Sequence, residues 1–90
     1  MKIKVNCEEH AVAIVKAFIN IGITDYGYSD IVLFLDSTHL FYNSIGRGRI
    51  SKMSGTDLYN NNRYFIRHHG KEVTLKDIIE LKLEMNGKGN

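Results

Sequence analysis

The residues best suited to chemistry lie mid-chain, where glycine and arginine alternate in Gly46-Arg47-Gly48-Arg49. Such a loop can offer backbone N–H groups and two guanidinium groups to a phosphate. It lacks the Lys-Ser/Thr ending of a P-loop, and it does not match a GxGxxG sequence before a helix. A second interpretation therefore stays open: a hairpin turn whose glycines serve backbone geometry and whose arginines are solvated.

Basic residues are concentrated around this loop. The segment from Ser44 to Lys71 holds six basic residues and one acidic residue, Asp57, whereas the rest of the chain holds six basic and nine acidic ones. The formal charge of +2 thus combines a segment of +5 with a remainder of −3. This asymmetry indicates an anionic partner. The basic residues of the segment are Arg47, Arg49, Lys52, Arg63, Arg67 and Lys71.

Aromatic residues accompany these cations. Tyr26, Tyr28 and Tyr59 fall in expected loops, where core packing does not require them. Aromatic rings beside arginines form stacking platforms for bases and hot spots for protein partners. The alternative is that some rings simply cover an open face of a sheet. The candidate ligand-binding residues are Tyr26, Tyr28, Arg47, Arg49, Lys52, Tyr59, Arg63, Phe65 and Arg67.

The stretch 63–67 is interpreted as a strand. Alternation along a strand places Arg63, Phe65 and Arg67 on one face and Tyr64 and Ile66 on the other. If the second pair faces the helices, Phe65 is an exposed aromatic between two arginines. Such a residue serves binding rather than folding.

Metal and catalytic chemistry receive little support from the pattern. Adjacent His68 and His69 would point to opposite faces of a strand, so we expect neither a metal site nor a cofactor. Cys7 could be a nucleophile with His39 or His69, but no signature surrounds it, and we expect no catalytic residue. A hydrolase or nuclease using His68, His69 and Asp57 is the third functional hypothesis.

The flanking elements are expected to be helices and strands in the order β-α-β-β-β-(β)-α. A strand at 2–5 would leave Lys2 and Lys4 on its wet face. A helix over 7–21 would begin at an Asn6 cap, with Glu9 completing a capping box, and end at Gly22. The last helix would begin at Thr74, answered by Asp77.

The middle of the chain is expected to supply the sheet. The apolar run 31–35 predicts a central strand, forming a hairpin with 39–43. Shorter strands follow at 50–53 and 63–67, and 54–62 is expected to be a loop. The predicted fold class is α+β, an antiparallel sheet of three to four strands with two helices packed on one face.

The length of 90 residues predicts a single domain over 1–85, followed by a flexible tail at 86–90. One cysteine and the lack of a signal sequence or an apolar run near 20 residues indicate a cytoplasmic setting without a membrane span. The small core and possible free strand edges are compatible with a homodimer.

Five segments at caps, turns and core positions suggest a resemblance to a known class of proteins. They are Glu9-His10-Ala11, Ile21-Gly22-Ile23, Tyr26-Gly27-Tyr28, Tyr64-Phe65 and Lys71-Glu72-Val73-Thr74-Leu75-Lys76-Asp77. With these segments, the whole layout resembles small accessory proteins of large tailed bacteriophages. This resemblance implies a binding role: inhibiting a host enzyme, blocking a defence complex or sequestering a nucleotide signal. It carries over no catalytic residue.

The order of elements from Cys7 onward is also similar to double-stranded RNA-binding domains. That family has a lysine-rich start to its last helix, whereas Thr74-Leu75-Lys76-Asp77-Ile78 holds one lysine and an acid. The leading hypothesis is therefore a non-enzymatic phage binding protein for a host protein or an anionic, nucleotide-like ligand in the host cytoplasm. Sequence-independent nucleic-acid binding is the second.

Overall fold

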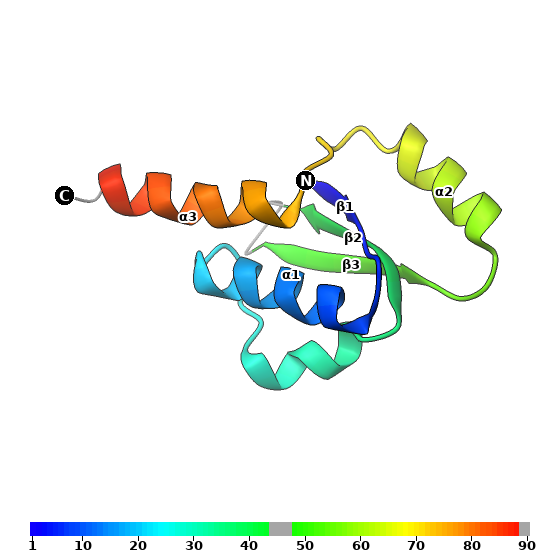
Figure 1. The fold of residues 1–90 in the computed structure, drawn as a ribbon, viewed down its shortest axis with the longest axis horizontal. Helices are drawn as coiled ribbons and strands as arrows, with labels where there is room; N and C mark the ends of the chain where they lie inside the picture. Colours follow the sequence, from blue (N-terminus) through cyan, green and yellow to red (C-terminus); the bar gives the residue numbers. More distant parts are fainter. Residues whose placement is uncertain (44–47, 89–90) are drawn as a thin grey trace.

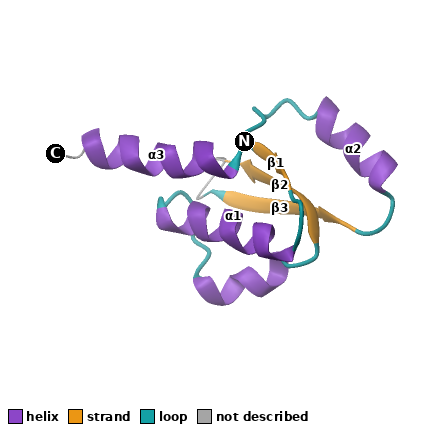
Figure 2. Ribbon diagram, in the orientation of Figure 1, coloured by secondary structure: helices purple, strands orange, loops and turns teal. Residues whose placement is uncertain are grey.

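A computed structural model of the chain describes residues 1–43 and 48–88. Three strands form one antiparallel sheet in the order β1-β2-β3, surrounded by helices (Figure 1 and Figure 2). The predicted α+β class and antiparallel sheet are confirmed. In chain order the elements are β1 (Lys2–Lys4), α1 (Glu8–Asn20), the 3-10 helix η1 (Tyr28–Phe34), β2 (Ser37–Asn43), β3 (Arg49–Ser54), α2 (Leu58–Arg67) and α3 (Leu75–Lys88).

The two faces of the sheet are covered by different helices. Ile3 pairs with Leu40 across β1 and β2, and both lie in the core beneath α1. Because strand side chains alternate, Lys2 and its partner Phe41 point to the opposite face. That second face is covered by α2, which lies at the edge of the molecule in Figure 1.

The main core lies between the sheet and α1. Ile14, Val15 and Phe18 repeat at helical spacing and are fully buried, together with Ile78 from α3. The expected end of α1 is confirmed, since Gly22 follows the C-cap Ile21 with φ +74°.

The start of α1 differs from expectation. Cys7, not Asn6, occupies the N-cap position, and its side chain makes no capping hydrogen bond. Asn6 instead donates its backbone N–H to His10 Nδ1 at 3.0 Å. The predicted Asn6 cap is therefore wrong, and so is its capping box, because His10 and not Glu9 accepts the Asn6 N–H.

The apolar run 31–35 does not form the expected central strand. It belongs to η1, in which Ile31 and Phe34 are buried while Val32 and Leu33 are 66% and 53% exposed. A short apolar run does not distinguish a strand from a helix. Since β2 already pairs with β1 and β3, it has no free edge for a further strand, and the hairpin predicted between 31–35 and 39–43 is wrong.

The stretch 63–67 is helical too, which corrects the fourth predicted strand. Asp57 caps α2 by accepting the Asn60 N–H at 3.2 Å. Asn61 and Phe65, four residues apart, are the buried positions, which is the spacing of one helix face.

The chain after α2 returns to the sheet. Lys2 donates its N–H to Lys71 O at 2.8 Å, and Val73 donates to Lys2 O at 2.9 Å. These two hydrogen bonds form a parallel bridge between Lys2 and Glu72, which covers the outer edge of β1. The predicted capping box of the last helix is confirmed, since Asp77 N–H donates to Thr74 Oγ1 at 3.2 Å and Thr74 N–H to Asp77 Oδ2 at 2.9 Å. Helix α3 extends to Lys88, past the predicted domain end at residue 85.

Candidate binding site around helix α2

One side of α2 faces away from the sheet and carries aromatic, basic and aliphatic side chains. We name it the outer α2 face. Tyr59 and Ile66 are 71% and 70% exposed. The Arg63 guanidinium carbon lies 5.6 Å from the centroid of the Tyr59 ring. The outer α2 face consists of Tyr59, Arg63, Tyr64, Ile66 and Arg67, all exposed and none of them acidic.

The inner side of α2 is fixed by Phe65. This ring is fully buried, and its centroid lies 5.0 Å from that of His39 and 5.9 Å from that of Phe41. The expectation that Phe65 is an exposed binding aromatic is therefore wrong. A helix turns by about 100° per residue, so it separates Phe65 from Arg63 and Arg67, which alternation along a strand would have grouped with it.

Lys2 ties the end of α2 to the sheet. Its ammonium donates to Phe65 O at 2.5 Å, to His68 O at 2.8 Å and to Ile66 O at 3.4 Å. It also lies 4.8 Å from the centroid of the Phe65 ring. The expected wet position of Lys2 is wrong, since the residue is 7% exposed. Its charge satisfies the last carbonyls of α2 and complements the negative end of the helix dipole.

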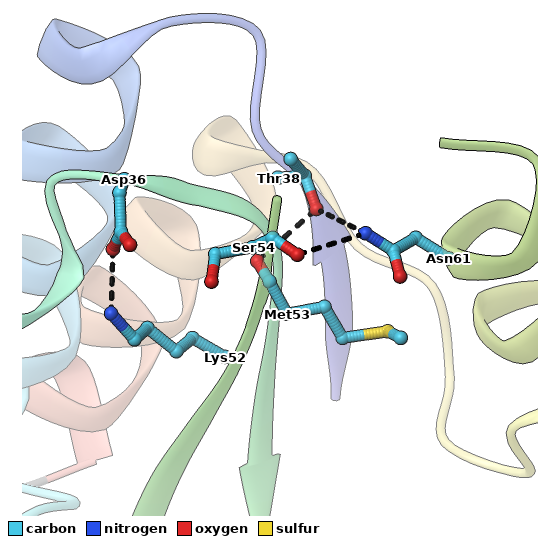
Figure 3. A network of polar contacts seen from close by, with 6 residues as sticks. All are labelled: Asp36, Thr38, Lys52, Met53, Ser54 and Asn61. Atoms are coloured by element: carbon cyan, nitrogen blue, oxygen red, sulfur yellow. Dashed lines mark hydrogen bonds and ion pairs between the residues drawn. The ribbon is translucent and has the colours of Figure 1, made fainter. Parts of the chain in front are cut away.

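The start of α2 is held by a polar network on the strands (Figure 3). Asn61 Nδ2 donates to Ser54 O at 3.3 Å and to Thr38 Oγ1 at 3.4 Å. Thr38 Oγ1 in turn donates to Met53 O at 3.1 Å. With Lys2 at one end and Asn61 at the other, α2 is anchored at both ends.

Lys52 does not join the outer α2 face. Alternation along β3 places it on the α1 side of the sheet, where its ammonium lies 2.5 Å from Asp36 Oδ1. The hydrogen bond from Lys52 lowers the pKa of the Asp36 carboxyl. The cations of the basic segment are thus distributed over both sides of the sheet.

A pocket of about 440 Å³ lies at the C-terminal end of α2, against strands β2 and β3. The His68 and His69 rings stack with centroids 4.8 Å apart and an interplanar angle of 14°. Phe41 contacts the His68 ring at 4.7 Å between centroids. The lining includes Phe41, Asn43, Ser51, Tyr64, His68 and His69.

The surroundings of His68 select one tautomer of its neutral ring and lower its pKa. Its Nδ1 accepts the Gly70 N–H at 3.0 Å, so the neutral ring carries its proton on Nε2. Loss of hydration lowers the His68 pKa, and the nearby positive charges of His69 and Lys2 add to this effect. The neutral ring is the form that the folded protein favours.

This preference predicts a pH dependence of stability. The folded-state pKa of His68 lies below 6.5, its value in the unfolded chain, so the unfolded state takes up the proton first as the pH falls. We expect the free energy of unfolding to decrease between about pH 7 and the folded pKa, and His68→Phe to decrease less over that range. Urea unfolding of both proteins at about pH 7.5 and 5.5 measures the difference. Equal pH dependence in the two proteins contradicts the assignment.

The structure brings together some of the predicted site residues and separates others. Tyr59, Arg63 and Arg67 share the outer α2 face. In the register of β2 and β3, Arg49 lies opposite Asn43, which is a lining residue of the pocket. Arg47 lies outside the described residues.

Two predicted tyrosines belong to the other side of the sheet, beside α1. Tyr26 is half-buried, with its ring edge-on to Phe34 at 5.4 Å between centroids. Tyr28 is exposed, and its hydroxyl donates to Asn20 Oδ1. Neither contributes to the outer α2 face.

Sequence reasoning missed Tyr64, Ile66 and Lys2 as parts of this region. The signal for the first two was present. Asp57 precedes Asn60 at capping distance, and Asn61 and Phe65 lie four residues apart, both typical of a helix. For Lys2 no local signal exists, because its partners lie more than 60 residues away along the chain.

Both ring nitrogens of His39, one of the two histidines considered as a base for Cys7, have other partners: Nδ1 lies 2.9 Å from Thr38 Oγ1 and Nε2 lies 2.8 Å from Asn62 Oδ1. Asp57 and His68 lie at opposite ends of a ten-residue helix, about 16 Å apart along its axis, so the helix does not bring Asp57 together with His68.

Residues 1–43 and 48–88 contain no group of three His, Cys, Asp or Glu side chains placed to hold a metal ion. No helix within the same residues has the length and apolar character needed to cross a membrane. Comparisons of the chain with models of protein families, with curated proteins and with solved structures find no match.

Proposed function

We propose that this chain is a non-enzymatic binding protein that captures a host protein through the outer α2 face. The observation that supports this proposal is the composition of that face. Two tyrosines, two arginines and an isoleucine are exposed together on a helix whose opposite side is packed on the sheet. Tyrosine and arginine are among the residues that dominate binding energy at protein interfaces.

The anchoring of α2 favours binding as well. Lys2 fixes one end of the helix and Asn61 the other, so the five side chains project from a rigid element. A surface ordered before binding loses less conformational entropy when the complex forms. We expect the outer α2 face to bind without rearrangement.

The charge of the outer α2 face indicates the kind of partner surface that would complement it. Arg63 and Arg67 bring two positive charges, while Tyr59 and Ile66 bring apolar area. A complementary surface is acidic, with apolar area beside the acidic groups. The resemblance to phage accessory proteins supports, as a proposal, a host enzyme or defence protein in the cytoplasm of an infected cell.

Charge reversal tests this proposal. We expect the double variant Arg63→Glu, Arg67→Glu to weaken binding of the purified partner at least about 100-fold, since loss of two hot-spot residues of about 2 kcal/mol each exceeds the corresponding 2.8 kcal/mol. A pull-down identifies the partner. Calorimetry then measures its affinity for the wild type and for the variant. Stability should change little, because both side chains are exposed.

The matched control is Lys16→Glu, Lys76→Glu, which changes the net charge equally on exposed positions of α1 and α3. It should retain the affinity. Equal loss in both double variants would mean that overall charge, not the outer α2 face, controls binding. A steep fall of affinity with salt and capture of any DNA or RNA would instead indicate the nucleic-acid hypothesis.

A further inference from the structure

The pocket at the C-terminal end of α2 presents several hydrogen-bond donors that no group in residues 1–43 and 48–88 accepts. The hydroxyl groups of Ser51 and Tyr64 have no hydrogen-bond partner among the described residues, and neither does the Nε2–H of His68. Exposed donors around one pocket form a site for an acceptor that the described part of the chain does not provide. The ligand should therefore be rich in hydrogen-bond acceptors.

The charges around the pocket favour an anion. Among the described residues its lining contains no Asp or Glu. Arg49 pairs with the lining residue Asn43, and alternation along β3 places it on the same face as Ser51. The Lys2 ammonium lies beyond the pocket lining, where it donates to the carbonyls of Phe65, Ile66 and His68. An anion in the pocket would be attracted by the positive charges of Arg49 and Lys2.

The rings of the pocket favour a planar group. Phe41, Tyr64 and the stacked histidines supply aromatic surface next to the donors. The volume of about 440 Å³ lies within the range of small-ligand sites. We propose that the pocket binds a nucleoside monophosphate, with its base against the aromatic rings and its phosphate against the donors. The protein capture proposed above rests on a different set of residues, since Tyr64 is the one described residue that the outer α2 face and the pocket lining share.

Gly70 positions the central donor. The Gly70 N–H donates a hydrogen bond to Nδ1 of His68. The proton of the neutral ring therefore lies on Nε2, where it can be donated to a ligand. A Cβ added at Gly70 would lie 2.9 Å from His68 Nδ1 and 3.0 Å from Cε1, too close for the ring to stay in place. Gly70→Ala therefore displaces the ring without removing it.

Titration with AMP, followed by NMR of the histidine ring signals, tests the proposal in the full chain. We expect AMP to shift the His68 and His69 signals, and adenosine or inorganic phosphate to bind about tenfold more weakly, because each lacks one half of the interactions. A 5′-phosphorylated dinucleotide distinguishes a free nucleotide from a strand end: tighter binding than AMP supports the strand end, and weaker binding supports the free nucleotide. Unchanged signals at millimolar AMP, or equal affinity for AMP and adenosine, would overturn the proposal.

Two variants locate the site. His68→Phe keeps a ring but removes the donor, and Gly70→Ala displaces the donor; each should weaken AMP about tenfold. His10→Phe, on α1 and outside the pocket lining, is the control and should bind as the wild type does. Full AMP affinity in both pocket variants would also overturn the proposal. The pocket variants should still capture the protein partner. In that case a failure of the nucleotide proposal leaves the proposal for the outer α2 face standing.

Discussion

Phe65→Ala is expected to lower the free energy of unfolding by about 3 to 5 kcal/mol, the usual cost of removing a buried phenylalanine. The ring is fully buried between α2 and the sheet, where it contacts Phe41, His39 and the Lys2 ammonium. Small domains are stable by only about 5 to 15 kcal/mol, so the loss is a large share of the total. Urea unfolding followed by circular dichroism measures it.

The exposed neighbours of Phe65 provide the control. Tyr64 and Ile66 are 56% and 70% exposed, and their replacement by alanine should cost well under the loss at Phe65. A strand at 63–67 would reverse this order, with Phe65 tolerant and its neighbours sensitive. The ranking of the three alanine variants therefore distinguishes the helix from the strand. A greater loss at Ile66 than at Phe65 would contradict the helix.

The elements that sequence predicted well carry their own local signals. The apolar stripe of α1 follows a helical period, and Gly22 has the positive φ that a helix end favours. Thr74 and Asp77 satisfy each other's backbone N–H groups within four residues. Such patterns depend on neighbours along the chain, so the sequence alone contains them.

The two wrong elements depend on distant partners. A hairpin of 31–35 with 39–43 needed a free edge on β2, which the pairing of β2 with β1 and β3 removes. Helix α2 contains three consecutive asparagines, which read as a loop because asparagine favours turns. Two of them contact the sheet instead, Asn61 through Ser54 O and Asn62 through the His39 ring. Tertiary contacts determine the helix here.

The candidate site was therefore predicted in composition more than in arrangement. Arg63, Arg67 and Tyr59 were expected to bind and do share an exposed face, but the helix, not a strand, groups them. Lys52 was separated from them because alternation along β3 turns it towards Asp36. The pocket could not be foreseen, since Tyr64 of α2 meets strand residues that lie 13 or more positions earlier in the chain.

Lys2→Met is expected to destabilise the protein by about 2 to 4 kcal/mol. Methionine replaces the aliphatic stem, but the carbonyls of Ile66 and His68 lose the Lys2 donor, and Phe65 O keeps the His68 N–H at 3.3 Å. Hydrogen bonds to a charged group contribute about 1.5 to 3 kcal/mol, and an unsatisfied buried acceptor adds about 1 to 3 kcal/mol. Replacing a buried charge by an apolar residue is harmless only when its partners are replaced too, which is not the case here.

Lys4→Met provides the comparison on the same strand. Lys4 is exposed, and its ammonium lies 5.7 Å from the Phe65 ring, so its loss should change stability little. Hydrogen exchange adds a local measurement: Lys2→Met should accelerate exchange in α2 more than in α1, because the lysine holds only α2 to the sheet. Equal stability of the two variants, or uniform acceleration across both helices, would show that Lys2 does not anchor α2. An anchored α2 is what keeps the outer α2 face and the His68 pocket in their observed positions.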